Sequence, residues 1–298
     1  MNCKTLVVVL LLIAAVLAVT ACDLAPAPPT PTFAPTPPPT AALPTPAPSP
    51  TATTPPTTTP THSVLRTPIP GSQQTDFTFV VCGDNRNGDA TYKRLLEMVV
   101  ADKVAFLINT GDLVSRGYDA YWKNFAQLMA GFPIPFFPVA GNHDLYDGAL
   151  KGFVKWTPNG QPRYSFDWGQ LHFTIANDSL GEMDDEELAW IDADLSATKQ
   201  PVKLVAHHHP AWDPDGSDHI MDGGNEAYLA LLKKHGVRYD LCGHDHRYRT
   251  GERDGTTLII TGGAGAPLYY PPEEGGFHHY VRFTVQGTDV RFDVVKIE

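Results

Sequence analysis

Five short apolar segments of this chain each end in a cluster of polar residues, and this pattern constrains the fold more than any other feature. The clusters read Gly83-Asp84-Asn85-Arg86, Gly111-Asp112-Leu113-Val114-Ser115-Arg116, Gly141-Asn142-His143-Asp144, His207-His208-His209-Pro210 and Gly243-His244-Asp245-His246. Ligands of open α/β sheets bind at the carboxyl ends of the strands, so we expect these clusters to gather at one edge. Carboxylate, amide and imidazole groups together suit a divalent transition metal.

The segments between the clusters alternate between strand and helix patterns. Amphipathic stretches predict helices over 90–101, 118–130, 184–196 and 225–235. Apolar runs predict strands over 77–82, 104–109, 135–140, 164–168, 171–177, 202–206, 239–242, 257–261, 280–285 and 290–295. Strand–helix units followed by a strand-rich end predict two sheets packed together with helices outside. Segments 148–162 and 212–224 carry no recognisable pattern, and we expect them to be loops that shape substrate choice.

The five clusters and their order resemble the calcineurin-like metallophosphoesterase superfamily. Its ordered blocks are GDxH, GDxxxR, GNH(D/E), a histidine shortly before a proline, and GHxH, and the matching positions here run from Asp84 to His246. The resemblance implies an α/β fold, a four-layer α/β/β/α sandwich of two mixed sheets with flanking helices. It also implies two metal ions between the sheet edges.

The resemblance assigns the ligands of the first ion residue by residue. Asp112 would bridge both ions, because a carboxylate has two oxygens to share, and Asp84 and His246 would hold the first ion. The identity of the ions stays open, since a mixed nitrogen and oxygen site accepts Mn, Fe, Zn or Co.

The second ion would be held by Asn142, His208 and His244. His208 is selected from the histidine triplet because the family's ligand usually stands two residues before the proline. Neighbouring side chains on a strand point to opposite faces, so His207 and His209 are expected to line the pocket or to pack behind it.

The implied reaction is hydrolysis of phosphomonoesters or phosphodiesters, with a metal-activated hydroxide attacking phosphorus. Paired cations lower the pKa of the parent water and neutralise phosphate oxygens. His143 would protonate the leaving alkoxide, and Asp144 would orient or polarise that histidine. Arg116 matches the arginine that contacts the substrate phosphate in related protein phosphatases, a task that suits a planar, always-charged fork.

The chain departs from the family pattern at Arg86, where the commonest form has a metal-binding histidine. Arginine cannot lose its proton to become a ligand. Either Arg86 reaches the substrate phosphate beside a two-ion site that has one protein ligand fewer, or only the second ion binds tightly. The first alternative is favoured because every other ligand is present.

The charge of the chain limits its partners. The formal net charge of −11 argues against a nucleic-acid-binding surface, so we expect a small organic phosphate or nucleotide as substrate. The alternative from another functional class is a catalytically silent, metal-stabilised surface binding domain. The retained pair His143 and Asp144 argues for the enzyme, because a binding module needs no leaving-group acid.

The amino-terminal segments indicate export and anchoring. Residues 1–22 contain an apolar run from Leu6 to Val19, too short to span a bilayer, and end in Val19-Thr20-Ala21-Cys22, which resembles the lipobox of bacterial lipoproteins. We therefore expect a lipid on Cys22 that anchors the chain to the outer face of a bacterial membrane, in the cell envelope. Residues 23–71 hold most of the 28 prolines and are expected to be a disordered Pro/Thr-rich linker, which leaves residues 72–298 as the metallophosphoesterase domain.

Two cysteines lie in that domain. Cys82 and Cys242 each end an apolar strand-like run, where small buried thiols are common. Two unreacted core thiols are the favoured reading, and a disulfide between them is the alternative that an exported protein permits.

Overall fold

The computed structural model describes residue 69 and residues 71–298. The predicted signal peptide, the lipid site at Cys22 and nearly all of the linker lie outside these residues. Within the described part of the chain, no helix combines the length and the apolar character needed to cross a membrane.

The first sheet has five strands in the order β11-β10-β1-β2-β3. Its strands are β1 (Asp76–Cys82), β2 (Leu107–Asn109), β3 (Phe136–Pro138), β10 (His279–Gln286) and β11 (Asp289–Lys296). The neighbours β1, β2 and β3 are parallel, whereas β10 is antiparallel to both β1 and β11. The parallel strands all end at the same edge of the sheet.

The second sheet has six strands in the order β4-β5-β6-β7-β9-β8. Its strands are β4 (Tyr164–Trp168), β5 (Leu171–Ile175), β6 (Val202–Ala206), β7 (Tyr239–Cys242), β8 (Tyr248–Arg253) and β9 (Thr256–Thr261). The four central strands are parallel, and β4 and β8 are antiparallel edge strands. Both sheets are therefore mixed, as predicted.

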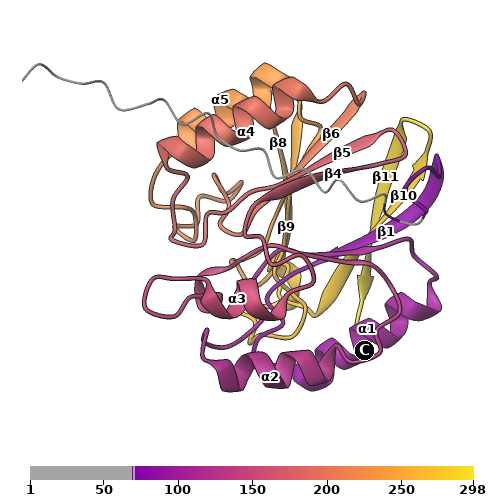
Figure 1. Cartoon of the computed structure of the whole chain (residues 1–298), viewed down its shortest axis with the longest axis vertical. Coiled ribbons are helices and arrows are strands. Elements are labelled where there is room, and N and C mark those ends of the chain that lie inside the picture. Colours follow the sequence, from indigo (N-terminus) through magenta and orange to yellow (C-terminus); the bar gives the residue numbers. More distant parts are fainter. Residues whose placement is uncertain (1–68, 70) are drawn as a thin grey trace, which may run out of the picture. The chain divides into compact units, whose positions relative to one another are not determined.

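Helices cover the outer faces of both sheets (Figure 1). The helices α1 (Asp89–Ala101), α2 (Asp119–Leu128) and α3 (Lys151–Trp156) share an apolar cluster with the outward-facing side chains of β1 and β2. The helices α4 (Asp185–Ala197) and α5 (Asn225–His235) pack on β6 of the other sheet. Short 3₁₀ helices span Asn142–Asp144 and Pro272–Glu274. The four-layer α/β/β/α sandwich is confirmed.

An aromatic core joins the two sheets. Phe79 stacks on Phe106, which directly precedes β2, and on Phe283 of β10, at ring-centroid distances of 4.9 Å and 4.6 Å. It meets Phe173 of the second sheet edge-on at 5.4 Å, a favoured aromatic geometry. Phe77, Phe79 and Val81 face this core while Val80 and Cys82 face the helices, because side chains alternate along a strand.

The two cysteines of the domain are free and buried. Cys82 packs in the cluster beneath α1, and Cys242 packs with Leu258 and Ile260 on the outer side of the second sheet. Since they belong to different apolar clusters, they do not form a disulfide. Burial raises the pKa of both thiols above its ordinary value, as expected for unreactive core residues.

The sequence missed helix α3, strand β8 and the two 3₁₀ helices, and it overestimated the lengths of β2 and β3. Helix α3 lies within 148–162, which was expected to be a loop, and β8 was not predicted at all. Strand β8 is a partly exposed edge strand of mostly polar residues, so it lacks the apolar run that marks a buried strand. The strand expected over 104–109 begins only at Leu107.

Candidate metal centre

The six predicted ligands come from the strand ends of both sheets. Asp84 follows β1, Asp112 follows β2 and Asn142 lies beyond β3 in the five-stranded sheet. His208 follows β6, and His244 and His246 follow β7, in the six-stranded sheet. The contacts described below show that all six meet where the carboxyl ends of the two sheets face each other.

Three of these residues have left-handed backbone conformations. Their φ values are 62° at Asp84, 56° at Asp112 and 64° at His244. This conformation costs an L-residue roughly 1–2 kcal/mol, and such outliers cluster at functional sites. Two glycines allow the close approach: a Cβ on Gly111 (φ 106°) would lie 2.5 Å from His208 Nδ1, and one on Gly141 would overlap the Asp112 carboxylate.

Three acceptor atoms converge at the position predicted for the second ion. His208 Nδ1 donates to the Thr110 carbonyl at 2.8 Å, which leaves Nε2 of a neutral ring without a proton. Nε2 lies 3.1 Å from Asn142 Oδ1 and 3.4 Å from Asp112 Oδ1. With Nδ1 carrying the proton, these three acceptors direct their lone pairs at one point, so the donor set fits a divalent metal ion.

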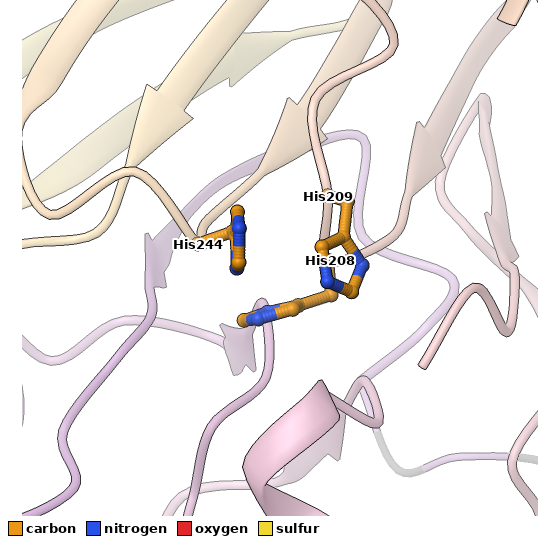
Figure 2. Close-up of side chains that lie close together, drawn as sticks. All are labelled: His208, His209 and His244. Atoms are coloured by element: carbon orange, nitrogen blue, oxygen red, sulfur yellow. The ribbon is translucent and has the colours of Figure 1, made fainter. Parts of the chain in front are cut away.

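Two further histidines lie beside this position. The metal-binding atoms of His208, His209 and His244 all fall within 4.8 Å of one another. Figure 2 shows the three rings close together, with His208 and His209 on one segment and His244 on the segment facing them. Burial and the neighbouring histidines lower the pKa of His244 to about 2, so its ring is neutral, as a ligand must be. His209 is buried, and its Nδ1 lies 3.5 Å from Asp178 Oδ2.

At the predicted first position, Asp84 and His246 face each other. Asp84 Oδ2 accepts the His244 backbone N–H at 2.9 Å, and Asp84 Oδ1 lies 3.5 Å from His246 Nε2. Burial alone would raise the pKa of Asp84, but its close approach to the His246 ring lowers that pKa to about 2. His246 Nδ1 donates to the Pro267 carbonyl at 2.6 Å, which aims Nε2 into the site.

Arg86 enters the same position. Its Nε donates to Asp112 Oδ2 at 3.0 Å, and its Nη2 lies 3.4 Å from both His246 Nε2 and the Tyr269 hydroxyl. Its side chain is only 13% exposed. Tyr269 is half-exposed and stacks on the His246 ring at 4.1 Å, in a loop where the sequence carried no recognisable signal.

His143 lies at the mouth of the centre. Its backbone N–H donates to Asp112 Oδ1 at 2.9 Å, and its ring Nδ1 donates to the Ser115 carbonyl at 2.9 Å. Nε2 lies 4.0 Å from Asp112 Oδ2, and the side chain is 34% exposed. A ring held in this way directs Nε2 toward the site.

The role predicted for Asp144 is wrong. Its carboxylate accepts the backbone N–H groups of Val114, at 3.1 Å, and Gly141, at 2.9 Å, instead of contacting the His143 ring. The Ser115 carbonyl orients the histidine. Asp144 therefore ties the Asp112 loop to the Asn142 loop, and burial together with the Asp112 carboxylate raises its pKa well above the ordinary value.

Arg116 is exposed. Its guanidinium makes no hydrogen bond or ion pair with any residue in the described part of the chain, so its predicted contact with the substrate phosphate stays a prediction.

A buried network that the sequence did not indicate holds the histidine triplet. Asp178 accepts the backbone N–H groups of His208 and His209, at 2.8 Å and 2.6 Å. His207 is fully buried between Asp178, at 3.1 Å, and Asp240, at 2.9 Å. Burial lowers the pKa of His207, but the two carboxylates overcome this effect and raise it to about 10. His207 packs behind the site, one of the two roles expected for it.

Clefts adjoin both sides of the centre. One of about 490 Å³ is lined by Asn142, His209, His219 and His244. Another of about 400 Å³ is lined by Arg86, Asn87, Ser115 and Tyr121. Each is large enough for a small ligand.

Comparison with known proteins identifies one family. The family model described as calcineurin-like phosphoesterase matches residues 77–248, more than half of the chain. The 3',5'-cyclic adenosine monophosphate phosphodiesterase CpdA of Escherichia coli is 26% identical over 183 residues, which cover 57% of this chain and 66% of that protein. A probable cyclic nucleotide phosphodiesterase of Moraxella catarrhalis is 31% identical over 165 residues, covering 47% of this chain and 58% of that protein. The chain thus spans less than two thirds of the length of these relatives, 66% of one and 58% of the other.

The solved structures with similar folds include a purple acid phosphatase, PPD1, from yellow lupin (Lupinus luteus) seeds. It superposes with a TM-score of 0.59 at 16% sequence identity, covering 76% of this chain and 52% of that chain. At this identity the likeness concerns the fold alone.

Proposed function

Because the chain belongs to the calcineurin-like phosphoesterase family, we propose that it is a metal-dependent hydrolase of small phosphodiesters or phosphomonoesters. The observation that carries this proposal is the convergence of Asp112 Oδ1, Asn142 Oδ1 and His208 Nε2 on one point beside His143. Cyclic nucleotides are the first substrates to test, because relatives of this chain are named for them.

A divalent ion in this centre supplies an activated water and positive charge for the phosphate oxygens. Asp112, Asn142, His208 and His244 are the residues that would hold it. Mn, Fe, Zn and Co all remain candidates, since the ligands mix oxygen and nitrogen.

The chain's own groups account for the remaining tasks. His143, oriented by the Ser115 carbonyl, presents Nε2 as the donor of a proton to the leaving alkoxide. Arg86, whose charge is permanent, provides a fixed cation beside the phosphate. A catalytically silent binding domain is not favoured, because it would not need a leaving-group acid. His143 is partly exposed, and its backbone N–H is hydrogen-bonded to the candidate ligand Asp112.

Activity of the purified full chain tests the proposal. The chain is stripped with a chelator, reloaded separately with Mn²⁺, Zn²⁺, Fe²⁺ or Co²⁺, and assayed on p-nitrophenyl phosphate, bis-(p-nitrophenyl) phosphate and 3',5'-cyclic AMP. We expect turnover with at least one ion and none after chelation. Absence of turnover with all four ions and all three substrates would contradict the proposal.

We also propose that the enzyme acts in the cell envelope, anchored by a lipid on Cys22. The support comes from the sequence: a short apolar leader, the lipobox-like Val19-Thr20-Ala21-Cys22 and the proline-rich tract that follows. Metabolic labelling with a clickable fatty acid should mark the full chain in the membrane fraction of a bacterial host, and Cys22→Ser should abolish the label. A Cys3→Ser variant is the matched control, and labelling of Cys22→Ser would exclude the anchor.

A further inference from the structure

We propose that the guanidinium of Arg86 occupies the first cation position of this centre, so that the chain binds a single divalent ion. That ion would sit at Asp112, Asn142, His208 and His244. This inference rests on the proposed function in taking the centre to be a metal site, and it concerns how many ions the site holds.

The two oxygens of the Asp112 carboxylate already face different partners. Asp112 Oδ2 accepts the Nε–H of Arg86 at 3.0 Å, whereas Oδ1 faces His208 Nε2 at 3.4 Å. In the family pattern these two oxygens serve two ions. Here one oxygen is bound to a guanidinium and the other remains for the ion at the second position.

Arg86 also contacts the ring nitrogen by which His246 would coordinate an ion. Its Nδ1–H is held by the Pro267 carbonyl, so the lone pair on Nε2 faces the site. The Nη2 atom of Arg86 lies 3.4 Å from Nε2 of His246. An imidazole nitrogen that accepts a guanidinium N–H cannot coordinate an ion at the same time. The ring is further fixed by its stacking on Tyr269 at 4.1 Å.

Charge favours one ion over two. The buried carboxylates Asp84 and Asp112 carry two negative charges. Arg86 and one divalent ion together carry three positive charges, so the net charge of the centre is +1. A second divalent ion would raise this net charge to +3 within a few ångströms of an arginine that cannot be deprotonated. The side chain of Arg86 is only 13% exposed, so solvent does little to screen that repulsion.

One atom of the first position has no bond to Arg86. Asp84 Oδ1 is buried and has no hydrogen-bond partner among the described residues. It lies 3.5 Å from His246 Nε2. If a histidine replaced Arg86, this oxygen, His246 and Asp112 Oδ2 would all be free to bind an ion. Arg86→His should therefore create a second metal site.

Metal stoichiometry tests the inference without reference to activity. The purified full chain is stripped, dialysed against Mn²⁺, and measured for bound manganese per chain by elemental analysis and for spin coupling by electron paramagnetic resonance. The wild-type chain should hold one ion with the spectrum of isolated Mn²⁺. Arg86→His should hold two ions with an exchange-coupled spectrum.

Two further variants complete the experiment. Arg94→His makes the same exchange at a surface arginine whose side chain is 58% exposed, and it should behave as the wild type. Arg86→Met adds no ligand but removes the guanidinium, so a second, weaker ion should titrate at higher Mn²⁺ concentration. This variant keeps the test decisive if Arg86→His fails to fold, as judged by circular dichroism.

The outcomes separate the inference from the proposed function. Two coupled ions in the wild-type chain would overturn the inference and leave the proposed hydrolase intact. No second ion in either Arg86 variant would show that the guanidinium is not what excludes it, which also overturns the inference. No ion at all in the wild-type chain would contradict the metal-dependent function itself.

Discussion

The two halves of the centre share one carboxylate but present different surfaces to a cation. On one side, Asn142 Oδ1, His208 Nε2 and Asp112 Oδ1 face one another, beside a His244 whose pKa is lowered to about 2. On the other side, Arg86 already bonds Asp112 Oδ2 and lies against His246. The ligand types are nearly the same, so the difference arises from a single residue. The family motif identifies the two cation positions. The individual side chains determine whether each position binds a metal ion or is filled by a guanidinium.

The largest expected effect comes from removing the residue that both halves share. Asp112→Asn keeps the shape of the side chain but removes the charge that Arg86 and the ion both use. We expect a loss of kcat/KM of more than about a hundredfold, because even outer-shell partners of metal ligands contribute about 10- to 100-fold. Steady-state kinetics and metal analysis on the same sample measure it. Retention of wild-type activity would show that Asp112 is not a metal ligand.

His143→Asn comes next, because it changes the chemistry without removing a ligand from either half. General acid catalysis typically contributes about 10²- to 10⁴-fold, so kcat should fall within that range for alkyl phosphate esters. With nitrophenyl esters, whose leaving group needs little protonation, the fall should be much smaller. An equal loss for both kinds of substrate would indicate that His143 positions Asp112 through its backbone N–H and is not the acid. Metal content should not change.

Matched ligand variants compare the two halves directly. His244→Ala should weaken Mn²⁺ binding by about 100-fold, since it removes a neutral ligand from the open half. His246→Ala should weaken it by less than about tenfold, because its partner there is Arg86 and not an ion. Equilibrium dialysis with both variants in parallel gives the ratio. Equal losses would abolish the distinction between the halves.

The smallest effect lies outside the centre and concerns stability. Burial lowers the pKa of His172, but its bonds to Asp167, at 2.6 Å, and Asp194, at 3.0 Å, overcome this effect and raise it to about 9. A raised histidine pKa stabilises the fold fully below the ordinary value of 6.5, and this contribution is lost as pH rises through about 9. His172→Asn should therefore lower the free energy of unfolding by about 2 kcal/mol near pH 6.

Denaturant titrations of the wild type and His172→Asn across this pH range measure that contribution. The gap between the two proteins should narrow as the pH rises through about 9. A gap independent of pH would mean that the charge of His172 does not contribute. The result sharpens the comparison, because the same residue type is held charged here and neutral at His244.

The sequence predicted the position of the candidate ligands because each one lies within four residues of the end of a strand that is easy to recognise. Asp84, Asp112 and His208 stand two or three residues beyond apolar runs, and the ends of neighbouring parallel strands have little freedom to diverge. The layers of the fold followed from the same runs. Helix α3 and strand β8 escaped because one is short and the other is a polar edge.

Side-chain direction was harder to predict than position. Asp144 follows His143 directly, yet its carboxylate turns to the backbone of Val114 and Gly141. Arg86 was expected to reach a phosphate, and its orientation depends on Asp112 and on Tyr269, which is far away in the sequence. Such choices are made by loops that meet only after folding, so no local pattern encodes them.

The candidate ligands come from two separate sheets, and this affects how the protein unfolds. Asp112 and Asn142 belong to one sheet, and His208 and His244 to the other, so an ion coordinated by all four fastens the layers together. A partly unfolded chain with separated sheets would keep only half of the donors and bind the ion far more weakly. Saturating ion should therefore slow the opening of the sandwich, and escape of the ion would report on the same event. The dissociation rate of the bound ion therefore reports how often the two sheets separate transiently at the aromatic interface around Phe79.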